Sequence, residues 1–128
     1  MIRRFVFTIG IGNGDAHLKN WALVYPDGRT ARLAPAYDYV STICYDAGDD
    51  LALPLSGERR WQRFSLERFD EFAIGASLSR RTVRRTVLDT VARMLTAWAE
   101  TKTQIADPAI IAALDANFAR VPVFKLRQ

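Results

Sequence analysis

The 128-residue sequence contains one cysteine, Cys44, and one histidine, His17. A lone cysteine excludes a disulfide within the chain, and one residue of each type excludes a zinc site built from cysteines and histidines. No apolar run approaches the roughly 18 residues that a membrane-spanning helix needs. The start of the chain has two arginines and a short apolar stretch but no small-residue cleavage site, so a signal peptide is not expected. We therefore expect a cytoplasmic protein that does not engage a membrane.

Several motifs of nucleotide-binding and hydrolytic enzymes are also absent. The glycines at positions 10, 12 and 14 do not form a dinucleotide fingerprint, because Asp15 follows them and a hairpin rather than a helix is expected next. Neither a P-loop nor a Gly-x-Ser-x-Gly elbow occurs. The net charge of +4 is a mild excess, which permits a phosphate-bearing ligand without requiring one. The 49% hydrophobic content is that of a globular protein.

Residues 1–57 are rich in glycine and in turn signals. The apolar run 5–11 fits either a buried strand or the end of a buried helix, because periodicity cannot separate the two over so few residues. Residues 21–25 and 29–33 read as strands on either side of the turn Pro26-Asp27-Gly28, which predicts a β-hairpin. Residues 51–55 are a candidate for another short strand.

Residues 58–128 are predicted to be helical. Ser65 can cap a helix that runs to about Ala73, and Gly75 is a plausible stop. Ser79 can cap a long second helix, and Asp107-Pro108 suits the start of a third. The expected apolar faces are Val83, Val87, Val91, Leu95 and Trp98 on the second helix, and Ile110, Ile111, Leu114 and Phe118 on the third. The predicted fold class is therefore α+β and mainly helical.

The start of the second predicted helix is crowded with arginines, at positions 80, 81, 84 and 85. Cations oppose the helix dipole there, which would favour an acidic neighbour. A merely solvated charge cluster is nevertheless the preferred interpretation. Direct DNA binding by these arginines is a weaker third possibility, because no helix-turn-helix pattern supports it.

Three oxygen-bearing residues flank the predicted hairpin. A strand of about five residues runs out by roughly 17 Å and its partner returns by the same distance, so residues that bracket a hairpin end up close together. Asn20 and Asp38 bracket this one, beside the loop that carries Asp15. Amide and carboxylate oxygens suit Mg²⁺, and a further carboxylate can accept a proton from an attacking hydroxyl. The arrangement favours phosphoryl transfer, with Lys19 as a phosphate-holding charge.

A structural interpretation of the same residues competes with this one. Taken only as residue types, Asp15, Asn20 and Asp38 are turn or capping residues more often than ligands. A single histidine such as His17 is likewise more often structural than catalytic. The residues alone leave both interpretations open.

Three segments in order resemble one family. Residues 12–20, Gly-Asn-Gly-Asp-Ala-His-Leu-Lys-Asn, resemble the catalytic loop of the HipA-like toxin kinases. Residues 33–42, Leu-Ala-Pro-Ala-Tyr-Asp-Tyr-Val-Ser-Thr, resemble their metal-binding segment, and residues 51–57 resemble the stretch that follows. The usual His-Arg before the catalytic Asp is absent, and position 38 lies in Tyr-Asp-Tyr rather than Asp-Phe-Gly, as is typical of this family.

The resemblance implies a serine/threonine protein kinase whose cofactors are Mg²⁺ and ATP. It implies that Asp15 is the catalytic aspartate, that Asn20 and Asp38 are the Mg²⁺ ligands, and that His17 and Lys19 have supporting roles. It also implies a protein substrate and a DNA-binding antitoxin as partners, without direct binding of nucleic acid by this chain.

A kinase also needs an adenine site and a phosphate-covering loop, which the few residues before the catalytic loop cannot supply. The chain is therefore expected to be a single partial domain, a kinase C-terminal lobe. Residues 1–57 would hold the catalytic loop, hairpin and metal segment, and residues 58–128 the helical part. An N-terminal lobe would be needed in cis or in trans, so the isolated chain is expected to be inactive. The alternative is a non-catalytic binding module of a toxin–antitoxin assembly, with an exposed apolar surface near residues 1–11.

Overall fold

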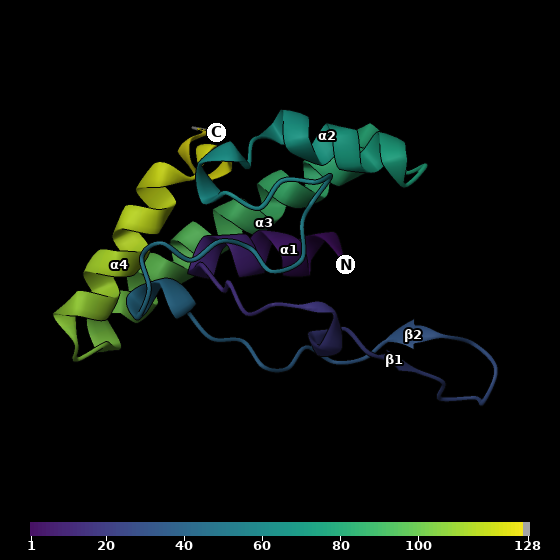
Figure 1. The fold of residues 1–128 in the computed structure, drawn as a ribbon, viewed down its shortest axis with the longest axis horizontal. Coiled ribbons are helices and arrows are strands. Elements are labelled where there is room, and N and C mark those ends of the chain that lie inside the picture. Colours follow the sequence, from purple (N-terminus) through teal and green to yellow (C-terminus); the bar gives the residue numbers. More distant parts are fainter. Residues whose placement is uncertain (127–128) are drawn as a thin grey trace.

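The computed structural model describes residues 1–126, which fold into a mainly helical body with one small sheet (Figure 1). The α+β, mainly helical fold class is thereby confirmed. The helices are α1 (Ile2–Ile11), α2 (Leu66–Gly75), α3 (Arg80–Thr101) and α4 (Pro108–Arg120), and the strands are β1 (Leu23–Val24) and β2 (Arg32–Leu33). Short 3₁₀ helices span Leu18–Asn20, Thr42–Cys44, Trp61–Arg63, Lys102–Gln104 and Pro122–Lys125. Within the described range, no helix is both long enough and apolar enough to span a bilayer.

The apolar run near the start of the chain forms the central helix, α1, which packs against α3 and α4. Phe5, Val6 and Ile9 are buried in the main core. The helix ends at Gly12, whose φ of 62° is the left-handed conformation that glycine adopts without strain. The N–H of Gly12 bonds the carbonyl of Ile9 at 3.2 Å, and the N–H of the next residue bonds that of Thr8 at 3.0 Å. This C-terminal cap turns the chain directly into the glycine-rich loop.

The last turn of α1 is also held by α4. Asn117 of α4 is almost fully buried, and its Nδ2 donates to the carbonyl oxygens of Ile9 at 2.9 Å and Gly10 at 2.8 Å. Carbonyls at a helix end have no partner within the helix, so a buried side-chain donor satisfies them. These two hydrogen bonds from Asn117 thus fix the end of α1, where the glycine-rich loop begins.

The three helices of residues 58–126 begin directly after the residues that the sequence predicts as caps. The Ser79 hydroxyl accepts from the N–H of Thr82 at 3.3 Å at the start of α3, and Asp107 accepts from the N–H of Ala109 at 2.8 Å at the start of α4. Ser65 precedes α2 without a side-chain cap bond, and α2 ends at Gly75, the predicted stop. The predicted apolar face of α3 is buried at Val83, Val87 and Val91.

The interpretation of the arginine cluster as merely solvated is wrong for two of its members. Arg84 donates to Asp70 of α2 from Nε at 2.8 Å and from Nη2 at 2.7 Å, and Arg80 Nη2 donates at 3.1 Å. The hydrogen bond from Arg84 is the main cause that lowers the pKa of Asp70 to about 2. The unfavourable charges at the start of α3 are therefore balanced by a carboxylate from the neighbouring helix. Arg81 and Arg85 remain exposed.

The hairpin is present but its strands are shorter than the residues 21–25 and 29–33 suggested. β1 and β2 pair in antiparallel register, Leu23 with Leu33 and Val24 with Arg32. The turn is closed by Asp27, whose Oδ1 accepts from the N–H groups of Arg29 and Thr30. The hairpin projects from the helical body (Figure 1), and Leu23, Val24 and Arg32 are exposed. Among the described residues no third strand joins the sheet.

The candidate strand at residues 51–55 does not form. The backbone N–H groups of Leu51, Ala52 and Leu55 bond the carbonyls of Arg59, Gly14 and Glu58 in turn. A strand needs one neighbour along its length, whereas these donors reach three separate partners. The segment instead runs beside the glycine-rich loop.

Candidate active site

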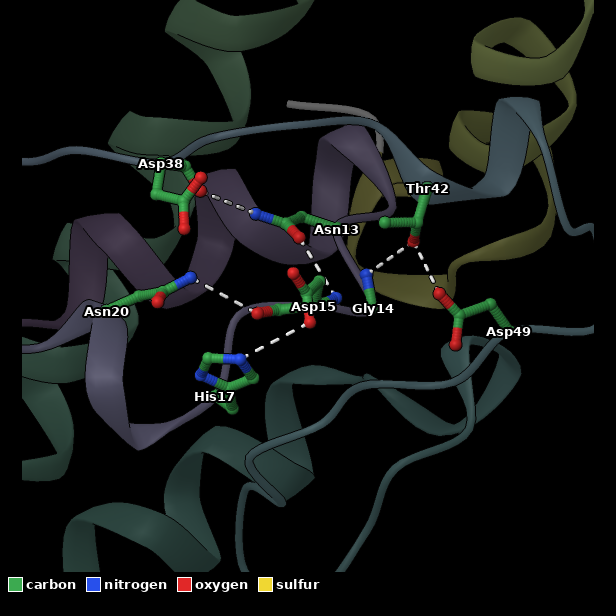
Figure 2. A network of polar contacts seen from close by, with 8 residues as sticks. All are labelled: Asn13, Gly14, Asp15, His17, Asn20, Asp38, Thr42 and Asp49. Atoms are coloured by element: carbon green, nitrogen blue, oxygen red, sulfur yellow. Dashed lines mark hydrogen bonds and ion pairs between the residues drawn. The ribbon is translucent and has the colours of Figure 1, made fainter.

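The loop after α1 is organised by a buried asparagine. Asn13 is fully buried, and its Oδ1 accepts from the N–H of Asp15 at 3.1 Å. Its Nδ2 points at the carbonyl oxygen of Asp38, 3.5 Å away (Figure 2). One side chain thus contacts both the residue that carries the candidate base and the residue that carries a candidate metal ligand.

Asp15 extends into solvent with His17 beside it. The side chains are 61% and 42% exposed, and His17 Nε2 lies 3.4 Å from Asp15 Oδ1. Asn20 Nδ2 donates to the backbone carbonyl of Asp15 at 3.2 Å, which closes the loop onto the 3₁₀ helix Leu18–Asn20. An exposed carboxylate on a fixed backbone can be reached by an external hydroxyl group.

Asn20 and Asp38 line one small cavity, together with Asn13 and Tyr37. Asp38 has a φ of 57°, the left-handed region that a residue with a side chain rarely adopts. Such backbone strain persists only where the surroundings impose it, and it is frequent at functional sites. The hairpin therefore brings Asp38 back beside Asn20, and Asp38 adopts a constrained backbone conformation there.

Lys19 is exposed on the same 3₁₀ helix. Its backbone carbonyl accepts from the Tyr37 hydroxyl at 2.8 Å, which joins the helix to the residue before Asp38. An exposed ammonium group one position before Asn20 could hold a phosphate as a point charge.

The segment after Asp38 is bonded directly to the glycine-rich loop. The N–H groups of Thr42 and Ile43 both donate to the carbonyl of Gly12, at 3.1 and 3.3 Å. The Thr42 hydroxyl accepts from the N–H of Gly14 at 2.7 Å. Sequence reasoning assigned no role to Asn13 or Thr42. Both residues lie inside the two motif segments, which was the one feature of the sequence that pointed to them. A hydrogen bond between distant loop residues produces no periodic pattern in the sequence.

The donor set suits a hard cation that also binds phosphate. Across residues 1–126, no group of three or more His, Cys, Asp or Glu side chains could hold a metal alone. Mg²⁺ usually takes one or two protein oxygens and completes its shell with water and substrate phosphates. The oxygens of Asn20 and Asp38 fit that requirement, and both residues line the same small cavity.

A larger groove lies elsewhere in the described part of the chain. It has a volume of about 840 Å³ and lies between α1, α3 and α4. Phe7 and Ile11 of α1 line it together with Met94, Trp98 and Phe118. An apolar surface beside α1 is therefore present, as expected for residues 1–11, although Phe5, Val6 and Ile9 of the same helix are buried in the core.

Residues 1–98 match the family described as the HipA-like C-terminal domain. The chain belongs to this family. The match includes the glycine-rich loop 12–20, the segment around Asp38 and most of α3, so all five candidate site residues fall within it.

Relatives with this HipA-like region are named as kinases. The chain is 40% identical over 126 residues to a Sinorhizobium fredii protein named "Putative kinase Y4dM", covering 97% of this chain and 31% of the relative. It is 34% identical over 103 residues to another from that organism, "Putative kinase Y4mE", covering 70% and 23%. A Haemophilus influenzae "Putative kinase" is 40% identical over 58 residues, 43% of this chain and 17% of the relative. The chain thus spans less than a third of these proteins.

A solved structure shares the HipA-like fold. It is the Shewanella oneidensis toxin–antitoxin complex of HipA, HipB and operator DNA, with a TM-score of 0.77 and 21% identity. The similarity covers 93% of this chain and 29% of that one. At this identity the comparison establishes the fold.

Proposed function

We propose that this chain is the C-terminal catalytic part of a HipA-like serine/threonine protein kinase. The reaction would be Mg-ATP-dependent transfer of a phosphoryl group to a Ser or Thr hydroxyl. The observation that carries the proposal is the convergence of the two motif segments. Asn20 and Asp38 share one cavity, and the exposed carboxylate of Asp15 stands on the loop beside it.

Each side chain has a role in this proposal. Asp15 orients the substrate hydroxyl and accepts its proton as the new oxygen–phosphorus bond forms and the bond to the ADP oxygen breaks. His17 lies beside this carboxylate and keeps it turned toward the substrate. Asn20 and Asp38 would hold Mg²⁺, which supplies neutralisation of the phosphate charge. Lys19 holds a phosphate oxygen.

The rest of the nucleotide site must come from elsewhere. Phosphoryl transfer needs a loop over the phosphates, a lysine for the α- and β-phosphates and an adenine pocket. We propose that these lie in the additional length that the relatives have, supplied in cis or in trans. The isolated chain is then inactive as a kinase, and the apolar groove between α1, α3 and α4 is covered in the complete protein.

Binding of Mn²⁺, a paramagnetic substitute for Mg²⁺, tests the metal ligands in the chain itself. We expect broadening of the amide NMR signals around Asn20 and Asp38, lost in Asp38→Asn and Asn20→Ala. Asp15→Asn should retain the broadening, because Asp15 is assigned to the proton rather than to the metal. Asp50→Asn is the matched control, an exposed carboxylate outside the cavity. Broadening that survives both ligand variants would overturn the metal assignment.

Transfer itself is tested in a chimera in which this chain replaces the matching region of Y4dM. We expect phosphorylation from labelled ATP on Ser or Thr, reduced at least a hundredfold by Asp15→Asn, the order expected for loss of a general base. Asp50→Asn should leave the rate unchanged. A normal rate in Asp15→Asn would rule out its role.

The competing candidate is a non-catalytic binding module, and ATP titration separates the two most simply. Micromolar Mg-ATP binding by the isolated chain would argue against the module. A DNA-binding antitoxin is proposed as the partner on the strength of the family and of its fold neighbour, solved with HipB and operator DNA. Co-purification of the complete protein with an antitoxin, and loss of the pair at high salt if DNA bridges them, would test this.

A further inference from the structure

The carboxylate of Asp49 occupies the space where a side chain at position 14 would lie. A Cβ placed on Gly14 would come within 1.9 Å of Asp49 Oδ2 and 2.3 Å of its carboxyl carbon. Such distances are far below van der Waals contact, so only glycine fits here while Asp49 stays in place. Gly14 immediately precedes Asp15, the candidate base. A carboxylate from a distant loop therefore packs against the backbone of the catalytic loop.

Thr42 connects this carboxylate to the loop. Its hydroxyl lies 2.5 Å from Asp49 Oδ2 and accepts the N–H of Gly14 at 2.7 Å. It also lies 3.1 Å from the carbonyl of Gly12. A hydroxyl has one proton to donate, and the shorter, charge-assisted contact to Asp49 is the stronger acceptor. Donation to Asp49 leaves a lone pair of the hydroxyl for the N–H of Gly14, and Figure 2 shows the Thr42 oxygen between the two partners.

Asp49 is itself held by the core. The indole N–H of Trp61 donates to the backbone carbonyl of Asp49, and Trp61 is buried. The N–H of Ala52 donates to the carbonyl of Gly14 at 3.0 Å. The segment 49–52 therefore holds Gly14 in two ways. Ala52 bonds the Gly14 carbonyl directly, and Asp49 bonds the Thr42 hydroxyl that accepts the Gly14 N–H.

This arrangement also relates the two halves of the candidate site. Thr42 lies four positions after Asp38 in the same segment, and Gly14 lies one position before Asp15. A bond between Thr42 and Gly14 therefore sets the spacing between the candidate metal ligand and the candidate base. Asp49 fixes the hydroxyl that makes this bond.

We propose that Thr42 and Asp49 are positioning residues, which hold the Gly14 peptide and with it Asp15. Their effect on catalysis rests on the proposed function, whereas the hydrogen-bond chain is a property of the fold. Neither residue touches the substrate in this account. Both act through the backbone of the catalytic loop.

Amide hydrogen exchange in this chain tests the bond chain without reference to activity. We expect protection of the Gly14 amide to fall about tenfold in Thr42→Val, the size of one lost hydrogen bond, and in Asp49→Ala. Thr42→Ser should restore it, because the hydroxyl is kept, and Asp49→Asn should restore it in part through its amide oxygen. Thr86→Val is the matched control, since that hydroxyl bonds only within α3. Unchanged Gly14 exchange in both Thr42→Val and Asp49→Ala would overturn the proposal, provided that the helices remain protected.

The same variants in the Y4dM chimera test the consequence for catalysis. Asp49→Ala and Thr42→Val should lower kcat about tenfold with KM for ATP unchanged, and Thr42→Ser should recover the rate. An equal kcat in all of them, alongside altered Gly14 exchange, would overturn the positioning role. An unmodified chimera without transfer activity would count against the proposed function, and Gly14 exchange would still decide the bond chain.

Discussion

Residues 12–57 and residues 58–126 are held together by different kinds of contact. The first region has only two-residue strands and short 3₁₀ helices. It adds Ile43, Leu51 and Leu55 to the core, but its loops are joined mainly by hydrogen bonds such as those of Asn13 and Thr42. The second has three long helices whose apolar faces meet α1 in one core. Free energy of unfolding therefore resides mainly in the helical region, while the geometry of the candidate site depends on individual polar contacts. Substitutions in the helical region should therefore lower stability, whereas those in residues 12–57 should mainly alter the geometry of the candidate site.

Phe69→Ala should have the largest effect on stability. Phe69 is fully buried in the core between α2 and its neighbours. Truncation of a buried phenylalanine costs about 3–5 kcal/mol, which is a large part of the stability of a small domain. Urea denaturation followed by far-ultraviolet circular dichroism measures the change. A loss below about 1 kcal/mol would show that the helical core is not the main source of stability.

Gly14→Ala should break the site region while the helices persist. The new methyl group would meet the Asp49 carboxylate, and overpacking of this kind costs about 1–3 kcal/mol. We expect unchanged helical content, faster amide exchange at residues 14 and 15, and weaker Mn²⁺ binding. Gly57→Ala is a contrasting variant, because a Cβ there meets nothing within 4 Å even though its φ is positive. Loss of helical content in Gly14→Ala would contradict the separation of the two regions.

Asp70→Asn should produce a smaller loss whose size depends on pH. Hydrogen bonding by Arg84, followed by that of Arg80, lowers the pKa of Asp70 to about 2 in the folded protein, below its unfolded value of about 3.9. A depressed pKa stabilises the fold above the unfolded pKa, and this contribution disappears as pH falls through the folded pKa. The stability difference between wild type and Asp70→Asn should be constant from pH 7 to about 5 and shrink between about pH 4 and 2. A difference that stays constant down to pH 2 would rule out this linkage.

Tyr25→Ser should have the smallest effect. Tyr25 is 54% exposed at the tip of the projecting hairpin. Substitutions at such positions usually change stability by less than about 0.5 kcal/mol. Thermal unfolding should be unchanged, as should Gly14 exchange. A marked loss would show that the hairpin packs on the body more closely than its exposure indicates.

The helical half was predictable because local rules decide it. The cap at Ser79, the Asp107-Pro108 start and the valine spacing along α3 are all visible in the sequence. The hairpin was predictable from its turn, and its geometry explains why Asn20 and Asp38 meet. These features depend on residues that are near neighbours or that repeat with the helix period.

The remainder depends on contacts between distant residues. Residues 5–11 could not be assigned, because periodicity cannot separate a buried strand from a buried helix over so few residues. Residues 51–55 look like a strand but have no neighbour to pair with. The partner of Arg80 and Arg84 lies on another helix, and Asp49 contacts Gly14 across 35 positions of sequence. Only the assembled fold reveals such pairs.

The amide of Asn117 meets the carbonyl of Ile9 across 108 positions of sequence. A ribosome adds about 5–20 residues each second, so this partner emerges roughly 5–20 seconds after the glycine-rich loop. Until α4 has formed, the end of α1 lacks its buried donor and the loop lacks a fixed starting point. The glycine-rich loop would then gain its fixed starting point only once α4, far downstream of it in the chain, has been made and has folded.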